Sequence, residues 1–310
     1  MNTRTSSNDV AYIQRSFQRT GKKYPALVGM LDTFEGLAIN RARIRNVLEQ
    51  MEHHDTPTFD PVSFSRGFPA LGGISIKDLG AALAAAVPAL SAALADAFPP
   101  LAGKIGAVNK KLAGNDPGTQ TCVDALLDNN LEKFKTSALT VSVSPETLLF
   151  ILSEYLKVVL ESKNNRTGAD MDSAGWQEGY CPFCGAFPDI AFLRNRGSET
   201  ETPSNFLKAQ GGQLWVHCSR CGHQWRVKRS ACVYCNSEEK KSYLTIEKEH
   251  RMRVYTCESC NKYIACVDER EDIEPDHPEA LVVGAVPFYT VAREKGFSPV
   301  VDTPLHHLNT

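Results

Sequence analysis

The chain of 310 residues is 42% hydrophobic and 23% charged, which is ordinary for a globular protein and long enough for one large domain or two smaller ones. Its net charge of −2 argues against a protein that coats nucleic acid or an anionic membrane through overall charge, although a local basic patch could still bind. The N-terminal stretch MNTRTSSNDVAYIQ lacks the apolar core of a secretory signal, so we expect a cytoplasmic protein. Its ten cysteines are then not expected to form disulfides, and those that occur in pairs are expected to bind metal or do redox chemistry.

The first half of the chain is predicted to be helical. Apolar residues recur there at steps of three and four, the spacing that places them on one face of a helix. The longest stripe contains Leu27, Met30, Leu31, Phe34, Leu37, Ala38, Ile44, Val47, Leu48 and Met51. Two others contain Leu126, Leu127, Leu131 and Phe134, and Leu148, Leu152, Tyr155, Leu156 and Val159. Ser144 is a candidate N-cap of the last helix, with Pro145 at its first position. We therefore predict a helical bundle over residues 1–175.

The stretch LGAALAAAVPALSAALADAF, residues 79–98, is long and weakly apolar, so it must be compared with a membrane span. It is mostly alanine, has Asp96 near one end and Pro88 in the middle, and has no basic bias in its flanks. These features favour a pair of soluble helices, broken or kinked at Pro88, and no membrane span.

A change in texture marks a second domain, predicted at residues 176–310. The polar stretch NNRTGADMDSAG, residues 164–175, is predicted to be the linker that precedes it. The apolar alternations QLWVH and MRVYT are typical of strands that run into cysteine pairs. Residues 194–212 are predicted to form a long polar loop, residues 270–280 an acidic segment, and the tail from about residue 281 one more helix.

Eight cysteines form four C-x2-C turns, each called a knuckle below. The knuckles are Cys181/Cys184, Cys218/Cys221, Cys232/Cys235 and Cys257/Cys260. Two such turns aim four thiolates at one ion, the tetrahedral shell that suits Zn²⁺ or a single iron. Gly185 and Gly222 follow two of the knuckles, and Asn236 and Asn261 follow the others; both residue types tolerate the positive φ of such a turn. The spacing predicts two metal ions, each bound by four cysteines, with iron and zinc both open.

An internal repeat indicates which knuckles share an ion. LWVHCSRCGHQWRV and RVYTCESCNKYIAC align at a constant offset of 39 residues, so each unit begins with one knuckle and ends with a strand-borne second one. This grouping pairs the first knuckle with the second across 33 residues, and the third with the fourth across 21. The predicted polar loop accounts for the longer interval. The stretch CSRCGHQWRVKRSACVYC then closes one site and opens the next, although its two knuckles are close enough in sequence to suggest a single finger.

The remaining cysteines and the histidines receive structural interpretations. Cys122 and Cys266 are expected to be small buried residues, with a redox role or a spare ligand as the alternative for Cys266. His217 and His223 flank a knuckle and are expected beside the site or at the surface, since four thiolates already complete a tetrahedron.

A basic cluster, defined as Arg220, Arg226, Lys228 and Arg229, lies between the second and third knuckles. It could recognise an acidic peptide or nucleic acid. It could also neutralise the two negative charges that four thiolates and a divalent ion leave at each site, which we favour.

The sequence contains no catalytic triad, paired-carboxylate site or phosphate-binding loop that we can identify. We therefore predict a protein that is not an enzyme.

The motifs YCPFCGAFP, HCSRCGHQWRVKRSACVYC and YTCESCNKYI, followed by an acidic stretch, resemble those of the formate dehydrogenase accessory protein family, FdhE. The resemblance covers residues 176–300; the first half matches in length and helical character.

The resemblance implies an α+β protein in which a helical bundle precedes a tandem rubredoxin-like or zinc-ribbon module of short antiparallel strands. It implies a cytoplasmic bacterial protein that takes part in formate dehydrogenase maturation by contacting the molybdenum-bearing catalytic subunit. It also implies two metal ions, iron in the family, held by the eight knuckle cysteines. Two other functions stay open: a double zinc-ribbon nucleic-acid binder, suggested by the cations around Arg226, and a rubredoxin-like redox protein in which iron changes oxidation state.

Overall fold

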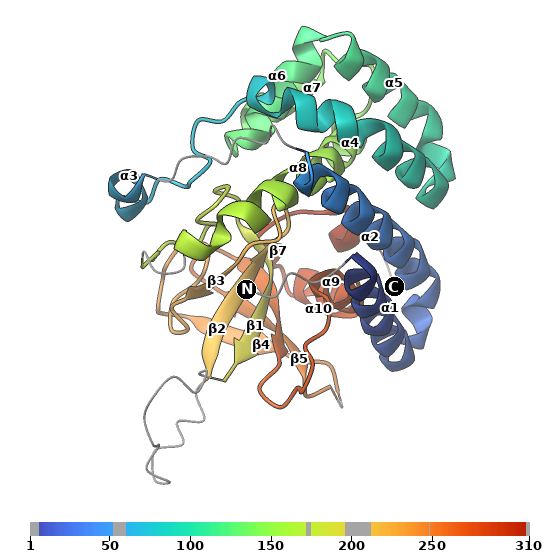
Figure 1. Ribbon diagram of the computed structural model, residues 1–310. Coiled ribbons are helices and arrows are strands. Elements are labelled where there is room, and N and C mark those ends of the chain that lie inside the picture. The colour runs from blue at the N-terminus through green and yellow to red at the C-terminus, as the bar shows by residue number, and fades with distance from the viewer. Residues whose placement is uncertain (1–5, 52–59, 172–174, 196–211, 248, 308–310) are drawn as a thin grey trace.

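The computed structural model describes residues 6–51, 60–171, 175–195, 212–247 and 249–307, and it has the α+β architecture that the sequence predicts (Figure 1). The first part is helical. Its α-helices are α1 (Ser6–Lys23), α2 (Val28–Glu49), α3 (Pro61–Ser65), α4 (Ile76–Ala97), α5 (Ala102–Ala113), α6 (Pro117–Leu127), α7 (Leu131–Ala138) and α8 (Pro145–Met171). Single 3-10 turns, Pro25–Leu27 and Pro99–Leu101, precede α2 and α5.

Local capping chemistry explains where several helices begin. The Asp60 carboxylate accepts hydrogen bonds from the backbone N–H groups of Val62 and Ser63, and Asp116 does the same for Thr119. Proline follows each of these aspartates at a position where its missing N–H costs nothing. α8 also begins at Pro145, as predicted.

α4 runs without interruption through Pro88, so the predicted break into a pair of helices is wrong, and the alternative of a kink at this residue stays a prediction. Pro88 lies on the exposed side of α4, where water can satisfy the carbonyl that loses its helical partner. The opposite side packs into the core through Leu83, Leu90 and Leu94. In the part of the chain that the structure describes, α4 is the one helix long and apolar enough to cross a membrane by length and composition, and 44% of that window is buried. A core helix passes the same test, and the lack of a membrane span stays a prediction.

α8 extends through residues 164–171, which the sequence predicts as linker. Ser162, Lys163 and Asn164 are buried, so contacts with the second half of the chain override the weak helix propensity of this polar stretch. Residues 172–174 and 196–211, the remainder of the predicted linker and most of the predicted polar loop, lie outside the described residues.

The second part of the chain contains one mixed sheet in the order β3-β2-β1-β6-β5-β4, with β7 also paired to β6. Its strands are β1 (Pro188–Arg194), β2 (Gln213–Cys218), β3 (Gln224–Val227), β4 (Lys241–Leu244), β5 (Met252–Cys257), β6 (Lys262–Asp268) and β7 (Ser298–Pro299). β1–β2–β3 and β4–β5–β6 are two antiparallel units, as predicted. They join through parallel pairing of β1 with β6, which adds a parallel element to the expected antiparallel module.

The two faces of the sheet pack against different helices (Figure 1). Because side chains alternate along a strand, Ala191 and Leu193 of β1 join an apolar cluster with α4, α6 and α8. Ile190 and Phe192 face the other way and join a cluster with α1, α2 and the C-terminal helices. Both clusters therefore contain residues from either side of position 175. The division into domains at 1–175 and 176–310 stays a prediction.

The tail contains two helices rather than one, α9 (Pro278–Gly284) and α10 (Val286–Glu294). The acidic segment before them is tied to α1, because Arg19 pairs with Glu274 at 3.0 Å and with Asp276 at 2.6 Å. Gly284 packs so closely on α1 that a Cβ would lie 2.8 Å from Thr20 Cγ2.

Candidate metal centres

The structure brings the eight knuckle cysteines into two groups, matching the grouping that the repeat predicts. Site 1 consists of Cys181, Cys184, Cys218 and Cys221, and site 2 of Cys232, Cys235, Cys257 and Cys260. Within each site the four sulfur atoms lie within 4.8 Å of one another. That these thiols bind metal stays a prediction, and their geometry can be compared with what an ion requires.

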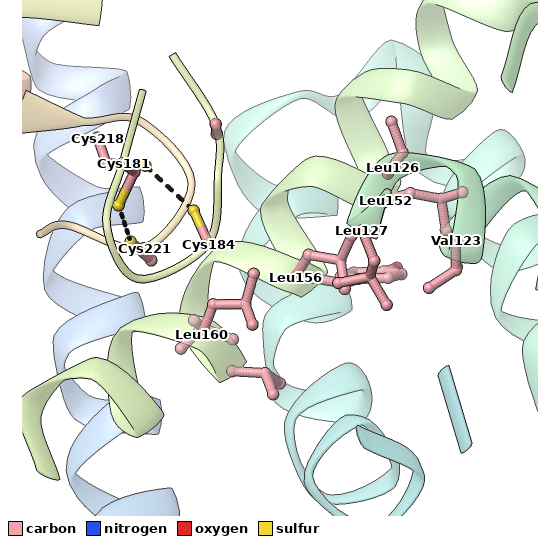
Figure 2. Close-up of a cluster of buried hydrophobic side chains, with 14 of the residues drawn as sticks. Val123, Leu126, Leu127, Leu152, Leu156, Leu160, Cys181, Cys184, Cys218 and Cys221 are labelled. Carbon is pink, nitrogen blue, oxygen red and sulfur yellow. Dashed lines mark hydrogen bonds between the residues drawn. The ribbon is translucent and has the colours of Figure 1, made fainter. Parts of the chain in front are cut away.

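The sulfur spacing fits a tetrahedral ion. A metal–sulfur bond of about 2.3 Å implies sulfur atoms about 3.8 Å apart at the corners of a tetrahedron. At site 2 the Cys232–Cys260 and Cys235–Cys257 sulfur distances are 3.9 and 3.8 Å. At site 1 the Cys181–Cys221 and Cys184–Cys218 distances are 3.5 and 3.4 Å (Figure 2). Both donor sets can therefore hold Zn²⁺ or a single iron.

The first, second and third knuckles are each closed by a backbone hydrogen bond within the turn. The N–H of Gly185 donates to the carbonyl of Cys181 at 2.9 Å, and the N–H of Asn236 donates to Cys232 at 2.9 Å. All four residues that follow a knuckle have positive φ, namely Gly185 (76°), Gly222 (69°), Asn236 (58°) and Asn261 (53°). The turn geometry inferred from these residue types is confirmed.

The repeat extends to the strand pairing. Val216 pairs with Trp225 in β2–β3, and Tyr255 pairs with Ile264 in β5–β6, the same positions 39 residues later. Each hairpin therefore presents the knuckle at its turn in the same orientation relative to its strands.

Site 1 is enclosed. Its cysteines are between 0% and 7% exposed and belong to the same apolar cluster as Leu156 and Leu160 of α8 (Figure 2). Burial raises the pKa of the Cys181 and Cys221 thiols well above the ordinary value. Burial of four negative thiolates without a counter-charge is unfavourable, so deprotonation of all four requires a bound cation. A divalent metal ion would supply that charge.

The helical half of the chain holds the first knuckle of site 1 in place. The N–H groups of Ala70 and Leu71 donate to the carbonyls of Pro182 and Phe183, each at 2.8 Å. The Asn129 side chain, between α6 and α7, donates to the carbonyl of Cys184 at 3.3 Å. It also accepts a hydrogen bond from Arg220 at 2.7 Å. The residues around 70 and Asn129 are functional neighbours that the sequence did not reveal, because they lie more than 50 positions from the knuckle that they contact.

The two histidines that flank the second knuckle are buried and lie outside both sulfur groups. His217 Nδ1 is 2.9 Å from Asp189 Oδ1, and His223 Nδ1 is 3.0 Å from Asn164 Oδ1. Burial alone would lower the pKa of His217, but the charge and hydrogen bond of Asp189 outweigh it and raise that pKa. The expected position beside the site holds for both residues, and each ties β2–β3 to a neighbouring element.

Site 2 is open on one side. Cys232 and Cys257 are buried, whereas Cys260 is partly exposed and Cys235 is exposed. Lys241 of β4 donates to the carbonyls of Arg229 and Ala231 at 2.8 and 3.0 Å, which anchors the start of the third knuckle. Burial lowers the pKa of this lysine, and the charges of Cys232 and Cys257 act in the opposite direction. Lys241 is thus a cation near the thiols that the sequence did not reveal.

The basic cluster is divided between two environments. Arg220 is bound to Asn129 beside site 1. Burial would raise the pKa of the Cys184 thiol, but hydrogen bonds with the neighbouring thiols and, as a smaller contribution, the charge of Arg220 lower it. Arg226, Lys228 and Arg229 are exposed, and Lys228 pairs with Glu238. The favoured neutralising role therefore suits Arg220, whereas Arg226 and Arg229 are exposed where a partner could contact them.

The two unpaired cysteines lie outside both groups, buried as expected. Burial raises the pKa of Cys122 to about 11 and that of Cys266 to about 12. At these values both thiols are protonated near neutral pH, which suits packing in the core.

Comparisons with known proteins indicate relatives in one group. No family model matches the chain. Protein FdhE homolog from Aquifex aeolicus is 28% identical over 169 residues, which is 53% of this chain and 54% of the relative. Protein FdhE from Escherichia coli K12 is 24% identical over 132 residues, which is 42% of this chain and 39% of the relative. These matches span about half the length of the curated relatives or less.

A solved structure has the same fold over the whole chain. The crystal structure of the FdhE protein from Pseudomonas aeruginosa matches with a TM-score of 0.67 and 17% identity, covering 100% of this chain and 99% of that one. The arrangement of helices and sheet described above is therefore shared with that structure.

Proposed function

We propose that this chain belongs to the FdhE family and is an accessory protein for formate dehydrogenase. Its similarity to curated FdhE proteins supports this proposal. In this proposal it acts in the cytoplasm, catalyses no reaction of its own, and binds the catalytic subunit of the enzyme during maturation. The observation that carries the proposal is the match to FdhE proteins in a chain that holds two four-thiol groups.

The two sites would act as a scaffold that positions the contact surface. Each ion, iron or zinc, would fix two turns relative to each other, and structural sites of this kind contribute on the order of 10 kcal/mol to folding. The exposed cations Arg226 and Arg229 lie on the connector between the sites. Tyr234 and Tyr243 follow it and are 42% and 60% exposed. Aromatic and arginine side chains of this kind are typical of protein contacts.

The accessory role is tested by deleting the gene and measuring formate dehydrogenase activity. We expect activity to fall strongly in the deletion strain and to return when the wild-type gene is supplied. A deletion strain with normal activity would contradict the proposal. Metal analysis of anaerobically purified protein identifies the ion, and zinc alone would exclude redox cycling at these sites.

The contact surface is tested by co-purification with the tagged catalytic subunit. We expect the double change Arg226→Glu and Arg229→Glu to weaken binding, because it reverses two exposed charges without touching a thiol. Lys104→Glu with Lys110→Glu, on exposed positions of α5, is the matched control and should bind normally. Equal binding by both double variants would place the contact elsewhere, and salt-sensitive binding of RNA by the wild type would favour the nucleic-acid alternative.

A further inference from the structure

The two sites are equivalent in sequence and unequal in their surroundings. The second cysteine of the first knuckle, Cys184, is 7% exposed, whereas its counterpart in the third knuckle, Cys235, is exposed. The last cysteines differ in the same direction, since Cys221 is buried and Cys260 is partly exposed. An external donor can therefore approach the thiols of site 2 without any movement of the chain.

Opening site 1 would disturb contacts far beyond the knuckle. Cys184 is held through its carbonyl by Asn129, and the two residues before it are bonded to Ala70 and Leu71. On the other knuckle, Gly222 lies against α8, where an added Cβ would be 3.4 Å from Glu161 Cγ. Movement of either turn must break hydrogen bonds or packing with the helical half of the chain.

Site 2 is held by contacts among neighbouring turns and strands. The hydroxyl groups of Ser237 and Ser259 lie 3.1 Å apart and link the two knuckles outside the thiols. Lys262 lies over the Tyr234 ring at 5.4 Å, next to Cys235. The main chain of the third knuckle is fixed at Val233, where Gly179 approaches so closely that a Cβ would lie 1.8 Å from the Val233 carbonyl oxygen. Cys235 itself is exposed, two positions beyond this close contact.

We propose that site 2 exchanges its ion with external ligands through the exposed Cys235, while site 1 retains its ion as part of the folded core. The incoming ligand is an external donor for the ion, a thiol or a chelator such as EDTA. Its bond to the ion forms as the Cys235 sulfur–metal bond breaks, the released Cys235 thiolate takes up a proton from the incoming thiol or from water, and no electron is transferred. The inference rests on the part of the proposed function that gives each site an ion, and it is independent of which enzyme is the client.

The test is metal release from the full-length protein loaded anaerobically with zinc. EDTA is added, and released zinc is followed with a metal-binding dye. We expect one equivalent to leave at least about tenfold faster than the other, because the slow equivalent requires local opening of the core. Release of both equivalents in a single phase would overturn the inference.

Two variants assign the phases. Cys235→Ser should lose the fast equivalent and keep the slow one. Asn129→Ala leaves all eight thiols in place and should accelerate the slow phase alone, so it remains informative if Cys184→Ser does not fold. A slow phase that is lost in Cys235→Ser, or a fast phase that changes in Asn129→Ala, would overturn the assignment.

Protein that binds no zinc would refute both this inference and the proposed metal scaffold. Normal biphasic release, together with no effect of gene deletion on formate dehydrogenase activity, would refute only the proposal that formate dehydrogenase is the client.

Discussion

Gly185 is a position where a side chain has two separate effects on stability. Its φ of 76° lies in the left-handed region, and an added Cβ would lie 3.0 Å from Asn129 Nδ2 and 3.1 Å from Pro69 Cγ. We expect Gly185→Ala to lower the free energy of unfolding of the metal-loaded protein by more than the roughly 1–2 kcal/mol that left-handed backbone costs a non-glycine residue. Urea denaturation measures this difference.

Gly296 provides the matched control for Gly185. It has a φ of 83° and nothing within 4 Å of an added Cβ, so Gly296→Ala isolates the backbone cost. If both variants lose the same stability, the close approach of Asn129 and Pro69 contributes nothing.

Glu279 is predicted to give stability a dependence on pH. Burial would raise its pKa, but the charges of Arg41 and Lys157 outweigh burial and lower it well below the ordinary value. The stability that this carboxylate contributes is therefore complete above the unfolded pKa, near 4.5, and is lost as pH falls below it. We expect Glu279→Gln to cost about 3–5 kcal/mol at pH 7, and the difference from wild type to narrow below about pH 4.5.

Denaturation curves of both proteins between pH 7 and pH 3.5 test this expectation. Only their difference is used, because acid protonates the thiolates of both alike. Glu132→Gln, whose side chain is 86% exposed, is the control and should differ from wild type by at most about 0.5 kcal/mol at every pH. A difference for Glu279→Gln that stays constant with pH would contradict the assignment.

At the residue scale, spacing was sufficient to find the thiols and insufficient to find their neighbours. Gly185 and Asn236 could be recognised because a knuckle constrains the φ of the residue that directly follows it. Asn129 and Lys241 could not, because their contacts depend on how separate segments meet. Neither has a local pattern that distinguishes it from an ordinary surface residue.

α4 shows that a helix can form although one of its residues, Pro88, disfavours helical structure. Pro88 removes one helical hydrogen bond, yet burial of Leu83, Leu90 and Leu94 keeps the segments before and after Pro88 in one helix. We expect Pro88→Ala to raise the free energy of unfolding by about 1–3 kcal/mol, since it restores an N–H donor at an exposed position. Thermal and urea denaturation of the full-length protein measure the change.

Ala89→Gly is the control for Pro88→Ala, because Ala89 is also exposed on α4 and glycine should cost about 0.5–1 kcal/mol. A destabilised Pro88→Ala protein would show that the helix needs the geometry imposed by proline in order to pack.

The balance between local sequence preference and tertiary burial also explains which element boundaries were predicted well. The repeat predicted both hairpins because each strand pair is local, with Val216 opposite Trp225 and Tyr255 opposite Ile264. The predicted end of α8 was wrong because Asn164 is buried and contacts His223, which lies 59 positions away in the sequence. Polar composition suggested a linker, and tertiary burial made it helix.

At the scale of the whole molecule, the pairing that joins the units β1–β2–β3 and β4–β5–β6 could not be predicted from the sequence. Ile190 of β1 pairs with Ala265 of β6 in parallel, 75 positions apart, and no turn connects the two strands. The pairing forms one sheet from two repeats and leaves their metal groups in different surroundings. Site 1 then faces the helical half, and site 2 does not share its enclosure.

This asymmetry predicts how loss of each ion spreads through the molecule. At site 1, Ala70 and Leu71 donate their N–H groups to the first knuckle, so their protection from hydrogen exchange depends on that turn. We expect removal of both ions to increase exchange at Ala70 and Leu71 as well as at the knuckles. In Cys235→Ser, exchange should increase around the third and fourth knuckles while Ala70 and Leu71 stay protected. Hydrogen exchange measured by mass spectrometry resolves these segments. Equal deprotection of Ala70 and Leu71 in both samples would mean that the two sites stabilise the fold as one unit, and that the enclosure of site 1 does not give it a separate role.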